Sequence, residues 1–197
     1  MRRQKRVSLH SKLIAPNQAQ TGYVLAEAGP ALWLIFVGIL FPLLVLATLT
    51  FRFGLFWAAA GQAAQYACGA QVFSPSSGST QPPVVPAVTL ASTTANSVLN
   101  MFPGSVTLVQ PVNVYIGTTP INTSVTSWSS TPNVPLSSVD TDENMYSIKV
   151  VLVGQVEPLI RITLPYFGTI PGLTSPFIAT VAEERVFENP SGLTQLQ

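Results

Sequence analysis

A continuous run of 24 uncharged residues, Ala28 to Phe51, constrains the fold of this chain more than any other feature. At about 1.5 Å per residue, a helix over this run extends roughly 36 Å, enough to cross a hydrocarbon core of about 30 Å with some tilt. Cytosolic flanks of membrane helices are enriched in Lys and Arg. The charged side chains that precede Glu27 are all basic: Arg2, Arg3, Lys5, Arg6 and Lys12. We therefore expect a single-pass protein of the cytoplasmic membrane, with a cytosolic amino end and an exported C-terminal part.

Charge is sparse and acidic in the expected exported part. No charged residue occurs between Arg52 and Asp140, a stretch rich in Ser, Thr, Pro, Gln and Asn. After Arg52 there are three basic and seven acidic residues, a net charge of −4. Nucleic-acid binding requires clustered Lys or Arg, which this part lacks. The composition suits an envelope or surface protein and gives no reason to expect a nucleic-acid partner.

The residues needed for common kinds of catalysis are missing or separated. A Ser or Cys nucleophile usually needs a neighbouring His, and His10 lies in the basic leader. The single cysteine, Cys68, excludes an intramolecular disulfide and a multi-cysteine metal site. The Asp140-Thr-Asp-Glu143 stretch is open to two interpretations, an oxygen-ligand calcium loop or a solvated turn, and it lacks the glycine of the EF-hand spacing. We expect a solvated turn there, no enzymatic activity, no cofactor and no metal.

The order of elements predicts an α+β protein with a long helix followed by a small, mainly antiparallel sheet. We expect a leader over 1–22, a helix over 23–73 with its transmembrane half at about 28–51, a Pro/Ser/Thr-rich linker over 74–100, a β-rich domain over 101–190 and a tail over 191–197. Apolar residues alternate from Tyr146 to Leu152 and continue over Leu159–Leu164, a strand pattern. Val106 to Ile116 predicts an edge strand, or two short strands separated at Pro111. Phe177 to Phe187 is ambiguous between strand and helix, and its β-branched residues favour a strand.

Small residues dominate the second half of the expected helix. They recur at helical spacing and comprise Ala59, Ala60, Gly61, Ala63, Ala64, Ala67 and Cys68. Small side chains let membrane helices approach closely. High helix propensity alone would explain the alanines but not the glycines. We therefore expect this part of the helix to pack laterally against other helices.

Glu27 stands at the start of the apolar run, where a carboxylate is costly. It lies five residues after Gly22, and Tyr23 follows that glycine. This spacing resembles the prepilin cleavage site, which implies cleavage after Gly22 by a prepilin peptidase and pairing of Glu27 with the new amino terminus of a neighbouring subunit. A pair of this kind offsets the desolvation cost of both charges. The other interpretation is a helix-start carboxylate stabilised by the helix dipole.

Two further stretches are similar to one family. The apolar segment from Pro42 to Gly54, followed by the alanine-rich Ala58 to Ala70, and the chain end from Phe177 to Glu188 resemble the TadE/TadG-like minor pilins (pseudopilins) of the tight-adherence (Flp-type) pilus. Glu27 lies farther from Pro42 than the corresponding glutamate of that family does. The resemblance implies a membrane-anchored structural subunit that acts in pilus assembly or surface attachment, with other pilin-like subunits and membrane lipid as partners.

Two alternatives remain open at this point. One is an unrelated bitopic, membrane-tethered binding module of the cell envelope, which would be neither processed nor assembled. The other is a secreted protein with a cleaved signal peptide, for which Ala58-Ala59-Ala60 offers small residues, although the apolar run exceeds the usual 7–15 residues.

Overall fold

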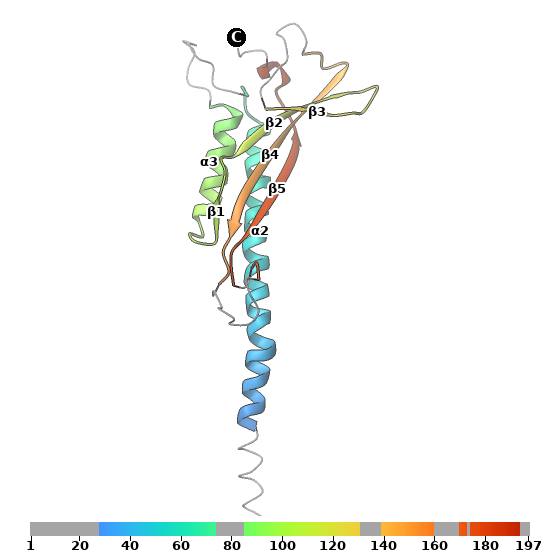
Figure 1. The fold of residues 1–197 in the computed structure, drawn as a ribbon. Helices are drawn as coiled ribbons and strands as arrows, with labels where there is room; N and C mark the ends of the chain where they lie inside the picture. Colours follow the sequence, from blue (N-terminus) through green and yellow to red (C-terminus); the bar gives the residue numbers. More distant parts are fainter. Residues whose placement is uncertain (1–27, 74–84, 131–138, 160–169, 173, 194–197) are drawn as a thin grey trace, which may run out of the picture. The chain divides into compact units, whose positions relative to one another are not determined.

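The computed structural model describes residues 28–73, 85–130, 139–159, 170–172 and 174–193 (Figure 1). The chain divides into two compact units, Met1–Leu44 and Val45–Gln197, and each is considered by itself. We call the second unit the head. One helix of 41 residues, Ala28–Cys68, contributes to both units. The helix expected over 23–73 is thus observed from Ala28 to Cys68, and its first five expected residues lie outside the described part of the chain.

In the first unit the helix is apolar and uncovered. No residue from 28 to 44 is buried, although the large apolar side chains include Leu32, Trp33, Leu34, Ile35 and Phe36. The backbone forms a π-helical turn, η1 (Phe36–Leu40), closed by the N–H of Phe41 donating to the carbonyl of Phe36. Pro42 follows directly and has no N–H to donate to the preceding turn. The helix accommodates this proline by widening one turn rather than by ending.

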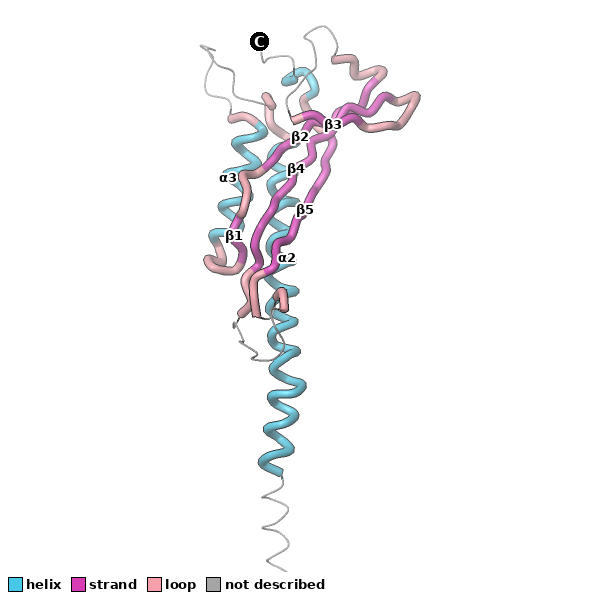
Figure 2. Tube along the Cα trace, viewed as in Figure 1, coloured by secondary structure: helices cyan, strands magenta, loops and turns pink. Residues whose placement is uncertain are grey.

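The head contains a five-stranded antiparallel sheet built around one long strand (Figure 2). That central strand is β4 (Asn144–Val156), and β5 (Phe177–Val186) pairs with it along one edge. On its other edge it pairs with β2 (Asn113–Pro120) and, farther along, with β1 (Val106–Leu108). The short β3 (Ser127–Ser129) extends the sheet beyond β2. Of the two possibilities for Val106 to Ile116, the structure has two strands, one on either side of Pro111. The strand over Phe177–Val186 and the α+β class are confirmed.

Alternation along β4 gives the sheet its buried face. Tyr146, Ile148, Val150 and Leu152 are all buried, as the alternating pattern predicts. They pack with α2 (Phe41–Cys68) and α3 (Ala87–Asn100) in a single hydrophobic core. The expected continuation over Leu159–Leu164 is not a strand at Leu159, and its remaining residues lie outside the described part of the chain.

The linker expected over 74–100 is wrong for its second half, which forms α3. Ala87, Ala91 and Ala95 recur at a four-residue spacing and are fully buried, so they form the apolar face of an amphipathic helix. Helix starts leave backbone N–H groups without intrahelical acceptors. In α3 the N–H of Ala87 donates to the carbonyl of Val72 (2.8 Å) and that of Val88 to Phe73 (3.2 Å). The segment that follows α2 thus caps α3 in place of a side chain.

Candidate functional site

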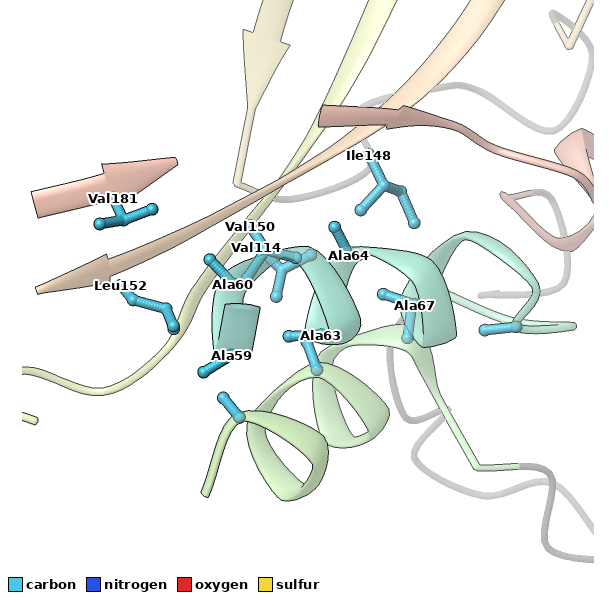
Figure 3. Packing of buried hydrophobic residues seen from close by; sticks show 14 of the residues in the cluster. Ala59, Ala60, Ala63, Ala64, Ala67, Val114, Ile148, Val150, Leu152 and Val181 are labelled. Carbon is cyan, nitrogen blue, oxygen red and sulfur yellow. The ribbon is translucent and has the colours of Figure 1, made fainter. Parts of the chain in front are cut away.

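The alanine-rich part of α2 forms the centre of the head's core. Ala59, Ala60, Ala63, Ala64 and Ala67 are fully buried. Figure 3 shows Ala60 and Ala64 on the side of the helix that faces Val150 and Ile148 of β4, while Ala59 and Ala63 lie on the side nearer α3. Small side chains at these positions leave room for the branched side chains of the sheet. These residues, predicted to pack against other helices, therefore pack against this chain's own sheet and α3.

Large side chains lock this packing at one end. Phe56 is fully buried, and its ring lies over Gly154 of β4, where an added Cβ would be 2.9 Å from two ring carbons. The same Cβ would be 3.0 Å from Val106 Cγ1. Glycine is therefore needed at 154 for the ring and the strand to approach each other.

The remaining face of α2 in the head is uncovered. It carries two small exposed residues, Gly54 and Ala58, together with the exposed Trp57. The exposed Tyr66 lies farther round the helix, where it lines a groove with α3. Gly61 is partly exposed, and a Cβ added at Gly54 or Gly61 would meet no atom within 4 Å. Trp57 Nε1 donates a hydrogen bond to the carboxylate of Glu183 on β5, which borders this face. Of the predicted packing residues, Gly61 alone is not buried in the head.

Cys68 ends α2 and is buried. Its thiol donates to the carbonyl of Gln65 (3.1 Å) and lies 4.0 Å from Glu188 Oε1. The N–H of Glu188 donates to the carbonyl of Cys68 (3.0 Å), and Asn189 Nδ2 donates to the carbonyl of Ala70 (3.4 Å). The segment that follows β5 thus satisfies backbone acceptors at the C-terminus of α2. The contacts around Cys68 therefore have a structural role.

The acidic turn before β4, Asp140 to Glu143, has a structural role. Asp140 Oδ1 accepts hydrogen bonds from the N–H groups of Asp142 (2.9 Å) and Glu143 (3.1 Å). A carboxylate that accepts from its own turn is typical of an Asx turn. Within the described part of the chain, no three His, Cys, Asp or Glu residues lie close enough together to hold a metal ion.

The outer face of the sheet carries a local aromatic contact. Trp128 of β3 lies against Gly117 of β2, where an added Cβ would be 2.7 Å from the indole ring. Lys149 Nζ lies 4.7 Å from the centre of the same ring, a cation–π geometry. The contact joins three strands on the face that lies away from α2.

The processing residues predicted from the sequence, Gly22, Tyr23 and Glu27, lie outside the described residues. Gly54, Ala58 and Trp57, which belong to the uncovered face, were not predicted from the sequence. Their spacing from Gly61 is helical, but the side of the helix that the sheet covers could not be known without β4. No family model, curated protein or solved structure matches the chain.

Proposed function

We propose that the chain is a membrane-anchored, pilin-like structural subunit that acts in pilus assembly or surface attachment. The observation that carries the proposal is the single helix Ala28–Cys68, whose two parts suit different surroundings. From 28 to 44 it is apolar and no residue is buried, whereas from Phe56 onward it supplies the core of the head. An apolar segment without a protein cover is stable where lipid surrounds it.

The orientation follows from the distribution of charge. The leader carries five basic residues, and the part after Arg52 has a net charge of −4. This asymmetry favours a cytosolic leader and an exported head. The basic leader would then be removed by a prepilin peptidase if Gly22 is its cleavage site.

Signal-peptide cleavage near Ala58-Ala59-Ala60 is a poor alternative for the folded head. Phe56, Ala59 and Ala60 are fully buried members of its core. Cleavage there would remove Phe56 and open a cavity against β4. Loss of a buried aromatic side chain costs about 3–5 kcal/mol, a large share of a domain's stability.

The uncovered face of α2 supplies a surface for neighbouring subunits. Gly54, Ala58 and Gly61 present little side-chain bulk there, so a second helix can approach closely. This assigns lateral packing to a different face from the buried alanines.

A photo-crosslinking amino acid at Gln65, an exposed residue two helical turns after Ala58 on the same face of α2, tests the proposal in the full chain expressed in its native host. We expect crosslinks that map to the N-terminal apolar helix of another subunit. The control position is Val125, a highly exposed residue in the β2–β3 connection of the head. Crosslinks from Val125 to an envelope protein, with none from Gln65 to another helix, would instead support the tethered binding module.

A further inference from the structure

Apolar side chains gather where the α3–β1 turn meets α2. A groove of about 330 Å³ is lined by Thr48, Phe51, Arg52, Met101, Phe102, Pro103 and Ser105. The rings of Phe51 and Phe102 meet edge to face with their centroids 5.6 Å apart. Met101 is nevertheless 67% exposed, Phe51 56% and Phe102 45%. Exposed apolar groups of this size are costly in water.

A second connection reaches α2 at the same level. A Cβ added at Gly172, in the β4–β5 connection, would lie 3.3 Å from Leu49 Cδ1. The guanidinium of Arg52 donates to the backbone carbonyl of Glu157, just after β4. The described ends of this connection also carry exposed apolar side chains, Leu159 and Ile170. Both connections therefore meet α2 within residues 48–52, at one end of the head (Figure 1).

This level coincides with the end of the uncharged run. The run ends at Phe51, and Arg52 is the first charged residue after it. We propose that this end of the head, formed by Phe51, Met101, Phe102, Leu159 and Ile170, rests in the interfacial layer of the lipid bilayer. The inference depends on the proposed membrane anchor and adds that the head lies against the membrane instead of standing clear of it.

Position, rather than exposure, favours lipid as the occupant. Val125 is 70% exposed and Ile121 60% in the β2–β3 connection, so apolar exposure also occurs elsewhere in the head. The proposed patch differs because it surrounds the residue where the apolar run ends, and a bilayer crossed by that run lies beside the patch. Aromatic side chains are enriched at this depth of a bilayer.

The charge at this end favours an apolar contact over an electrostatic one. Among the described residues there, Arg52 and Glu157 each carry one charge, of opposite sign. A surface attracted to anionic lipid would instead carry several basic residues. Binding to zwitterionic phosphatidylcholine should therefore suffice.

Spin labels on the full chain in phosphatidylcholine vesicles test this inference. Each label is attached to a cysteine introduced into a Cys68→Ser background, at Met101 for the patch, Val125 for the opposite end of the head and Ile39 for the middle of the apolar run. Collision rates with oxygen, which concentrates in the bilayer, and with a water-soluble nickel chelate report the depth of each label. Met101 and Val125 are similarly exposed, so they form a matched pair.

We expect the label at Met101 to collide several-fold less with nickel and more with oxygen than the label at Val125, with the Ile39 label deeper still. Partial replacement of phosphatidylcholine by phosphatidylglycerol should leave the Met101 values unchanged. If Met101 matches Val125 while Ile39 is in the bilayer, the anchor stands and the lipid contact is refuted. Low collision with both reagents at Met101 would mean that a second copy of the chain covers the patch, which also overturns the inference. An Ile39 label in water would refute the anchor itself.

Discussion

Substitution of Gly154 by alanine tests the packing of α2 against β4. The new methyl group would lie 2.9 Å from two ring carbons of Phe56 and 3.0 Å from Val106 Cγ1. Carbon atoms in ordinary contact are about 3.5–4.0 Å apart, so the ring would have to move by roughly 0.6 Å or more. Phe56 is fully buried, and its surroundings would have to move with it.

The expected cost follows from two opposing effects. Overpacking of a well-packed core costs about 1–3 kcal/mol. Replacement of glycine restricts the unfolded chain, which offsets about 0.4–1 kcal/mol of that cost. We expect Gly154→Ala to lower the free energy of unfolding by about 1–2 kcal/mol, and the Tm by roughly 2–8 °C for a unit of this size.

Thermal unfolding of the full chain in detergent micelles, followed by tryptophan fluorescence, measures this shift. Gly61→Ala is the matched control, because a Cβ added at Gly61 meets no atom within 4 Å. In a helix, alanine is more favourable than glycine by about 1 kcal/mol, so the control should leave the Tm unchanged or raise it. A Tm for Gly154→Ala at or above that of the unsubstituted chain would refute the packing argument.

Two further predictions separate the faces and the ends of the helix. Ala63→Leu should destabilise the head by about 1–3 kcal/mol through overpacking, because Ala63 is fully buried. Ala58→Leu, on the uncovered face, should preserve the Tm and reduce crosslinking between subunits. Equal Tm values for the two variants would contradict this assignment of faces. Gly22→Leu should block removal of the leader, while Glu27→Gln should be processed normally but assemble poorly. Intact-mass measurement of the protein purified from its native host checks the processing. A mature chain that still begins at Met1 would contradict cleavage after Gly22.

Strand patterns were predictable from the sequence because alternation on β4 is regular. Tyr146 to Leu152 alternate between the core and the other face, and the structure follows them. Helix α3 was missed because five of its 14 residues are Ser or Thr, which continue the composition of the preceding Pro/Ser/Thr-rich segment. Thr93 Oγ1 bonds to the carbonyl of Thr89 (2.9 Å), which satisfies the hydroxyl within the helix. The four-residue spacing of Ala87, Ala91 and Ala95, which the structure buries, is the sequence signal for α3.

The partner of the small-residue face could not be predicted from the sequence. An alanine face fits a neighbouring helix or a sheet of the same chain equally well, because small side chains constrain only the distance of approach. The choice depends on long-range pairs such as Phe56 with Gly154, for which neither local propensity nor periodicity gives a signal.

The orientation of the head across the membrane is the most direct test of the account. Val125→Cys in a Cys68→Ser background places one exposed thiol on the head, far along the chain from the apolar run. A membrane-impermeant maleimide is added to intact spheroplasts, and lysed spheroplasts provide the reference for full labelling. The account places the head on the exported side of the membrane, so it predicts that the thiol in intact spheroplasts is labelled as completely as after lysis. Labelling that appears only after lysis would place the head in the cytosol and contradict the account.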